Sequence, residues 1–226
     1  MKIWRRNWYY IGGIIFVALA FFMGFWGDMF SHIQVILIFS FMAMLVHQFE
    51  EYGWPGGFPS IVNIMQFKEK QIPDRYPFNQ NLCFVDNVFT TYTFYIVPVF
   101  FPDLIWLALA QSLAALIQVP AHGILVNIRL KSFYNPGLAA TLFLQLPIAI
   151  YMIWYVTTND IATGMDFAFG IIGAIVGYGL CFGVPIILMR DRNTKYPFAQ
   201  EEMYGYKKEE ILALQQKTSK EEKCDD

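Results

Sequence analysis

The sequence predicts an all-α fold: a polytopic membrane helix bundle of six transmembrane helices with both termini in the cytoplasm. Three observations predict this architecture. Of the 226 residues, 56% are hydrophobic and 15% are charged, whereas a soluble domain carries about 25% charged residues. Six apolar stretches each approach the roughly 20 residues that a helix needs to cross a bilayer. The 16 Lys and Arg residues all lie outside these stretches or at their ends.

The six predicted spans follow one another along the chain. We expect them at residues 9–26, 33–52, 81–101, 104–130, 136–157 and 167–189. The first stretch has a signal-peptide alternative, because residues 1–6 are basic and residues 18–20 resemble a cleavage site. The apolar run continues unbroken to Trp26, which favours a retained helix.

The charges of the loops predict the orientation of the bundle. The N-terminus, the loops after the second and fourth spans and the tail contain every basic residue. The other loops contain only acids: Asp28, Asp103, Asp160 and Asp166. Because basic loops stay in the cytoplasm, we expect an integral protein of a bacterial cell membrane with both termini on the cytoplasmic side. Residues 1–190 would form the transmembrane domain and residues 191–226 a charged cytoplasmic tail.

Two segments outside the spans show helical spacing. The loop 53–79 predicts a short interfacial helix over the end of the second span; its spaced residues are Ile61, Ile64, Met65 and Lys68. The tail predicts a short amphipathic helix on the membrane face, with a loosely ordered tail as the alternative. Its spaced residues are Met203, Tyr206, Lys207, Glu210, Ile211 and Leu214.

The sixth span is rich in glycine. It contains two GxxxG pairs, Gly173/Gly177 and Gly179/Gly183, which let helix backbones approach closely. We interpret them first as packing sites within the molecule. An oligomer formed through this helix is the alternative.

Composition and missing motifs exclude several functions. The net charge is −2 and no basic face recurs, which excludes a nucleic-acid partner. No GxxxxGK[ST] loop, GxGxxG fingerprint or CxxC pair occurs, so nucleotide-driven pumping and zinc-finger functions have no support.

Ionisable residues inside spans are costly and usually functional. The second span ends in a group that shares one helical face: His47, Glu50 and Glu51. The third span opens with Asp86 and Asn87, and the fourth carries Gln118, Pro120, His122 and Asn127. The predicted topology places these residues within about 10 Å of the inner interface, at similar depth. We therefore predict that Glu50, Glu51, His47 and His122 converge on one cavity that opens toward the cytoplasmic leaflet.

Amides complete the predicted site. Asn87 and Asn127 would orient a carboxylate or a water molecule, since an amide transfers protons poorly. Asn135, Pro136 and Gly137 are most simply a helix start, with Asn as N-cap and Pro at the first helical position. Asn135 facing the cavity is the alternative.

The motif at His47, Glu50 and Glu51 resembles the one that names the HXXEE-domain family of integral membrane proteins. The match extends over about residues 41–141 and takes in Asn87, His122 and the run Tyr-Asn-Pro-Gly-Leu at 134–138. The resemblance implies a membrane enzyme that uses His47, Glu50, Glu51, His122 and Asn87 or Asn127. A looser similarity to CAAX-processing proteases fails at Pro55, where their motif requires Arg.

These residues support two enzymatic hypotheses and one hypothesis of a non-enzymatic binding protein. In the first, His47, Glu51 and His122 bind Zn²⁺ or another divalent ion, and Glu50 acts as general base. In the second, Glu50 and Glu51 activate water without a cofactor. Both give a hydrolase or lipid-modifying enzyme whose partners are membrane lipids and whose substrate has an apolar tail. The competing class is a carrier, or an immunity or sensor protein, that binds a small molecule or cation at the same residues.

Overall fold

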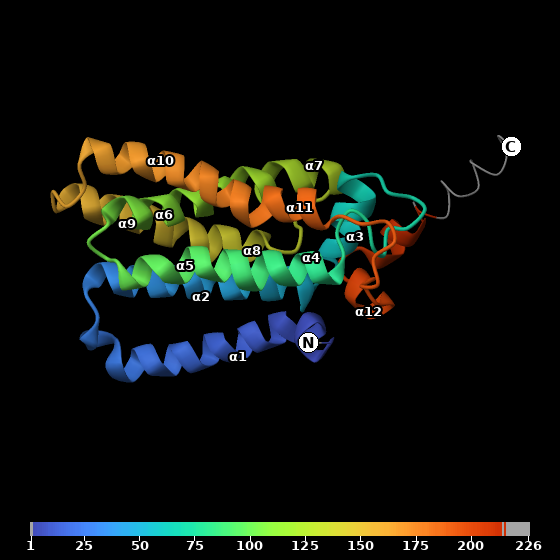
Figure 1. Ribbon diagram of the computed structural model, residues 1–226, viewed down its shortest axis with the longest axis horizontal. Helices are drawn as coiled ribbons and strands as arrows, with labels where there is room; N and C mark the ends of the chain where they lie inside the picture. The colour runs from blue at the N-terminus through green and yellow to red at the C-terminus, as the bar shows by residue number, and fades with distance from the viewer. Residues whose placement is uncertain (1, 214, 216–226) are drawn as a thin grey trace, which may run out of the picture.

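The computed structural model describes residues 2–213 and 215. Within this part of the chain the fold is all-helical, with six long helices side by side (Figure 1). Each is long and apolar enough to cross a membrane: Lys2–Met29, His32–Tyr52, Gln80–Phe100, Ile105–Leu130, Leu138–Thr158 and Gly164–Met189. This confirms the six predicted spans. The largest difference in boundary lies in the first helix, which already begins at Lys2.

Five of the six spans consist of more than one helical element. The first is α1 (Lys2–Trp26) with the 3-10 turn η1 (Gly27–Met29), and the second is α2 (His32–Tyr52). The third is α4 (Gln80–Phe84), η3 (Val85–Thr91) and α5 (Tyr92–Phe100). The fourth is α6 (Ile105–Pro120), η4 (Ala121–Val126) and α7 (Asn127–Leu130). The fifth is α8 (Leu138–Ala140), η5 (Thr141–Gln145) and α9 (Leu146–Thr158), and the sixth is α10 (Gly164–Tyr178), η6 (Gly179–Gly183) and α11 (Val184–Met189).

The third to sixth spans each contain a π-helical turn, namely η3, η4, η5 and η6. Such turns account for well under 1% of residues in proteins, and they occur frequently at functional sites. In the fourth span the turn begins directly after Pro120, which has no N–H to donate and collides with the preceding turn. In each of these four spans the α-helix is thus interrupted in the half nearer to Gln80, Leu130, Leu138 or Met189.

The glycines of the sixth span pack inside the molecule at its first half. A Cβ on Gly170 would lie 2.8 Å from Cβ of Leu109, and one on Gly173 would lie 2.9 Å from Cβ of Ala110. Only glycine therefore allows α10 to approach α6 this closely. Gly179 and Gly183 have no neighbour within 4 Å of their Cβ positions, so of the two GxxxG pairs only this second one is left open for the alternative, an oligomer contact.

The connection between the second and third spans contains the predicted short helix. It comprises α3 (Phe58–Ser60) and the π turn η2 (Ile61–Gln66). Its buried Asn63 donates to the carbonyls of Pro73 and Phe78 and accepts from the Phe78 N–H. These three bonds fix the fold of the long connection, which otherwise has little regular structure.

The described part of the tail is not a free solvated segment. It contains α12 (Gln200–Met203), and Phe198, Met203 and Ile211 are buried. Arg6 of α1 makes ion pairs of 2.9 Å with Glu201 and with Glu202. The predicted amphipathic helix is not continuous: α12 ends at Met203, residues 204–207 are non-helical and Lys207 has a φ of 56°. Met203 and Ile211 are buried as its spacing predicts, while Leu214 lies outside the described residues. The beginning of the chain and the described part of the tail therefore meet at one end of the bundle, which we call the N-terminal end (Figure 1).

The orientation can be tested by chemical labelling. In a background with Cys83, Cys181 and Cys224 replaced by Ser, we expect Asp103→Cys to react with an impermeant maleimide on intact cells. Asp103 is exposed in the loop at the far end of the bundle from the N-terminus. The matched variant is Ser132→Cys, at the N-terminal end, which should react only after lysis. Reversed labelling would contradict the cytoplasmic assignment of the termini.

Candidate metal centre

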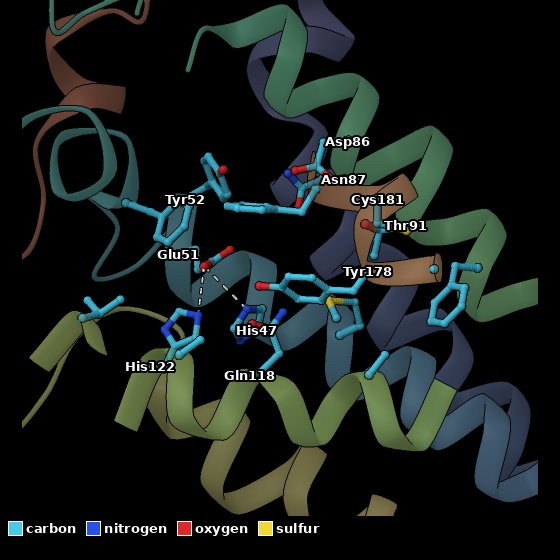
Figure 2. Close-up of a pocket in the computed structure, with 18 of the residues that line it drawn as sticks. His47, Glu51, Tyr52, Asp86, Asn87, Thr91, Gln118, His122, Tyr178 and Cys181 are labelled. Carbon is cyan, nitrogen blue, oxygen red and sulfur yellow. Dashed lines mark ion pairs between the residues drawn. The ribbon is translucent and has the colours of Figure 1, made fainter. Parts of the chain in front are cut away.

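A cavity of about 210 Å³ lies between the second, third, fourth and sixth spans, toward the N-terminal end (Figure 2). Glu51 and both buried histidines line it, together with Asp86, Asn87 and Gln118. The cavity has room for several water molecules. It brings together most of the polar residues that the sequence placed at one depth.

Two imidazoles and one carboxylate converge in this cavity. Nε2 of His47 and Nε2 of His122 each lie 3.5 Å from the same oxygen, Oε1 of Glu51. The two rings are 4.9 Å apart and nearly perpendicular. All three residues are at most 5% exposed. The predicted convergence of His47, Glu51 and His122 is therefore present.

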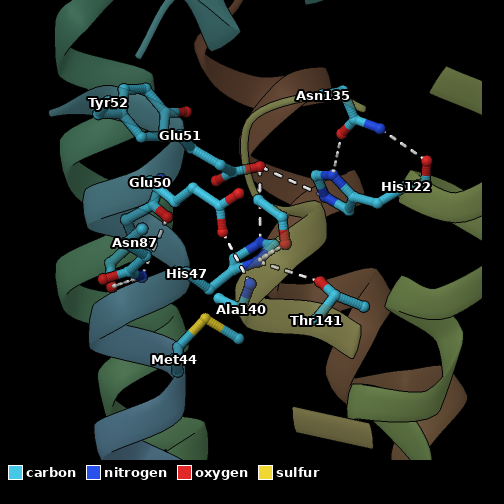
Figure 3. Close-up of polar contacts among 12 residues, drawn as sticks. Met44, His47, Glu50, Glu51, Tyr52, Asn87, His122, Asn135, Ala140 and Thr141 are labelled. Carbon is cyan, nitrogen blue, oxygen red and sulfur yellow. Dashed lines mark hydrogen bonds and ion pairs between the residues drawn. The ribbon is translucent and has the colours of Figure 1, made fainter. Parts of the chain in front are cut away.

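The opposite nitrogen of each ring is held by a hydrogen-bond acceptor (Figure 3). Nδ1 of His47 lies 3.0 Å from the carbonyl oxygen of Gly137 and 3.2 Å from Oγ1 of Thr141. Because a carbonyl only accepts, this nitrogen carries the proton of a neutral His47. The other nitrogen, Nε2, then presents a lone pair to Glu51.

The second histidine is held in the same way by an amide. Nδ1 of His122 lies 2.6 Å from Oδ1 of Asn135. The Asn135 NH₂ group donates to the carbonyl of His122 and to Oδ1 of Asn127, each at 2.7 Å. This network assigns the oxygen of Asn135 to the ring, so His122 also carries its proton on Nδ1. Asn127 thus acts through Asn135 and does not reach the cavity itself.

Three electron-pair donors therefore face one another without a proton between them. Such a group is repulsive when empty, and a cation at its centre makes it attractive. In a tetrahedral zinc site, bonds of about 2.0–2.2 Å separate neighbouring ligand atoms by about 3.4 Å, close to the two 3.5 Å distances found here. Histidine ligands of metals also donate their second N–H to a carbonyl or carboxylate. The residues present fit a divalent metal ion.

The carboxylate of Glu50, the predicted general base, lies outside the cavity and is held by hydrogen bonds. Its carboxylate accepts hydrogen bonds from the Tyr134 hydroxyl at 2.7 Å and from the N–H groups of Ala139 at 3.1 Å and Ala140 at 2.8 Å. These amides are the first free donors of the fifth span, where the helix dipole favours a negative charge. Glu50 does not line the cavity. Burial and the neighbouring Glu50 raise the pKa of Tyr134, which keeps this phenol a donor.

The predicted capping role of Asn135 is wrong. The residue before α8 is Gly137, and its φ of 96° lies in the left-handed region. A Cβ at Gly137 would lie 2.6 Å from Cε1 of His122 and 2.8 Å from Cε1 of His47. Asn135 and Gly137 thus both contact the histidines, the alternative that the sequence left open for Asn135.

The third span contributes Asn87 and Asp86 to the cavity wall. Asn87 accepts from Nε2 of Gln48 at 3.0 Å and donates to the carbonyl of Cys83 at 2.9 Å. It therefore ties the second span to the third at the level of the site. The sequence did not single out Thr141 or the carbonyl of Gly137 as partners of His47, because both depend on long-range contacts.

One family model matches the chain. Its description is "Protein of unknown function with HXXEE motif", and it matches residues 38–152, slightly more than half of the 226 residues. Neither the curated proteins nor the solved structures compared with this chain gave a match. The matched region contains His47, Glu51 and His122 and the hydrogen-bond partners of both histidine rings.

Replacing Asn135 with Ala should weaken metal binding without removing a ligand. The ring of His122 would lose the acceptor that fixes its tautomer, and loss of such a partner typically lowers metal affinity about 10- to 100-fold. Competition with a fluorescent zinc chelator measures this change. Asn159→Ala, an exposed asparagine at the other end of the bundle, is the matched control. Equal affinity in both variants would contradict the role of Asn135.

Proposed function

This chain belongs to the family of proteins of unknown function with an HXXEE motif, and on that premise we propose that it is a metal-dependent membrane hydrolase. His47, Glu51 and His122 hold the metal, with Zn²⁺ as the first expectation. The observation that carries the proposal is the pair of Nε2 atoms 3.5 Å from Glu51, with both Nδ1 atoms engaged elsewhere.

The donor set leaves a coordination position for chemistry. Two nitrogens and one oxygen would supply three protein ligands, the number that catalytic zinc sites use. A bound Zn²⁺ supplies an activated water at neutral pH and polarises a carbonyl or phosphoryl oxygen. Asn135 and Gly137 keep the imidazoles in the tautomer that binds metal, and the surrounding spans exclude bulk water.

The metal-free alternative, a pair of glutamates that share a water molecule, has less support. Only Glu51 lines the cavity, while both oxygens of Glu50 accept hydrogen bonds from the fifth span and from Tyr134. Glu50 therefore serves as a positioning residue. It holds the segment that carries Asn135 and Gly137 against the second span.

The expected substrate is a membrane lipid or another molecule with an apolar tail. Leu125, Arg129 and Phe182 line the cavity together with the site residues, so an apolar chain and a polar end both find partners there. Because basic loops stay in the cytoplasm, we expect this end of the bundle at the cytoplasmic leaflet. A bacterial cell membrane remains the expected location.

Reconstitution tests this function. Purified protein in liposomes of bacterial lipid, loaded with Zn²⁺, should convert a lipid to products that mass spectrometry detects, and a chelator should stop the conversion. Glu51→Gln should be inactive. Voltage-dependent solute uptake without any lipid turnover would overturn the hydrolase and favour the carrier.

A further inference from the structure

Asp86 is a buried carboxylate without a partner. It lies in η3, between one and two turns into the third span, and is 7% exposed. Within the described part of the chain, no residue makes a hydrogen bond or ion pair with its carboxylate group. It lines the same cavity as the metal group, on the wall opposite Gln118 in Figure 2. A polar group in this setting needs a partner, since leaving it unpaired costs several kcal/mol.

The metal centre does not supply that partner. The cluster that can share one ion consists of His47, Glu51 and His122, and Asp86 is not part of it. Arg129 is the one Lys or Arg among the described residues that line the cavity. It is exposed and lies seven residues beyond His122 in the fourth span. The interior of the cavity therefore has an unneutralised acid, while its basic group lies at the rim.

The walls around Asp86 are aromatic. Six aromatic side chains line the cavity: Tyr52, Phe58, Phe94, Tyr95, Tyr178 and Phe182. Ring faces attract cations, and recognition of quaternary ammonium groups commonly combines several rings. A carboxylate among aromatic rings is matched by an organic cation better than by a small hydrated ion, which would have to give up its water for π faces.

We propose that the cavity binds an ammonium group, with Asp86 as its counter-ion, and that the substrate is an amphiphile that carries this group. The claim that the bound molecule is a substrate rests on the proposed function. Binding of the ammonium group at Asp86 does not depend on the metal. An ammonium-bearing molecule would place its cation at Asp86, its reacting bond at the group of His47, Glu51 and His122, and an anionic part near Arg129.

Choline and its neutral isostere 3,3-dimethylbutan-1-ol provide the test, because they differ in charge and not in shape. Calorimetry on the purified full-length protein in uncharged detergent, with and without chelator, should show choline binding in both conditions. The isostere should bind at least tenfold more weakly. Octyltrimethylammonium should bind at least tenfold more tightly than choline when the ligand is an amphiphile, and equally when it is a free amine.

Variants of Asp86 complete the test. Asp86→Asn should lose choline binding at least tenfold and Asp86→Glu should retain most of it, while metal content stays unchanged in both. Asp103→Asn, an exposed acid at the far end, is the control. Equal binding of choline and its isostere to the unmodified protein overturns the proposal without needing any variant. A second equivalent of Zn²⁺ that disappears in Asp86→Asn would also overturn it, in favour of a second metal site.

Discussion

Purified protein in which His47 or His122 is replaced by Ala is expected to contain no stoichiometric zinc. Each substitution removes one of three protein ligands. Because loss of a mere hydrogen-bond partner of a ligand costs about 10- to 100-fold in affinity, loss of the ligand itself should exceed 100-fold. Elemental analysis after dialysis measures the change, with about one Zn²⁺ per chain expected for the unmodified protein.

The third histidine of the chain provides the control. His32 lies at the start of α2, is exposed, and contacts the Tyr151 hydroxyl at 2.8 Å. His32→Ala should keep the metal. Zinc in the His47 and His122 variants at the level of the unmodified protein would exclude the proposed centre.

Gly137→Ala should disrupt the site and the fold around it together. The methyl group would meet both imidazole rings at less than 3 Å, and the backbone has a φ of 96°. Left-handed backbone costs a non-glycine residue about 1–2 kcal/mol, and overpacking a core costs about 1–3 kcal/mol. We expect a loss of about 2–5 kcal/mol in stability, seen as a lower unfolding temperature in detergent, together with reduced zinc content.

Gly179→Ala is the matched substitution. Its Cβ would meet nothing within 4 Å and its φ of −61° is helical, so it should change neither the unfolding temperature nor the metal content. If Gly137→Ala behaves like Gly179→Ala, the close packing of the histidines on this glycine is not needed for the site.

The spans and the central part of the site could be predicted because they depend on local or additive properties. Apolar length alone identifies the six helices. The spacing of four residues places His47 and Glu51 on one face, and the alternation of loop charge gives His122 the same depth. The extension of α1 to Lys2 was missed, because Lys2, Arg5 and Arg6 interrupt the apolar pattern that defines a span.

The rest of the site depends on contacts between segments that are far apart in the chain. Glu50 and Glu51 are adjacent residues of the same type. The rotation of about 100° between them directs Glu50 to the amides of Ala139 and Ala140 and Glu51 to the histidines. Asn135 has the local sequence of a helix cap. The left-handed Gly137 starts the helix two residues later and frees the Asn135 side chain to reach His122. No local pattern distinguishes these outcomes.

The π-helical turns change how the chain tolerates insertions and deletions. Each π turn holds one residue more than an α-helical turn, and one residue corresponds to about 100° of rotation. Removing a single residue from η4 would restore regular α-helix and leave the rest of the fourth span, including Arg129, near its present orientation relative to α6, because the wider π turn already absorbs the rotation of its extra residue. Single-residue gaps among relatives should therefore be tolerated at 85–91, 121–126, 141–145 and 179–183, whereas a gap elsewhere in the same spans would rotate every later residue by about 100°.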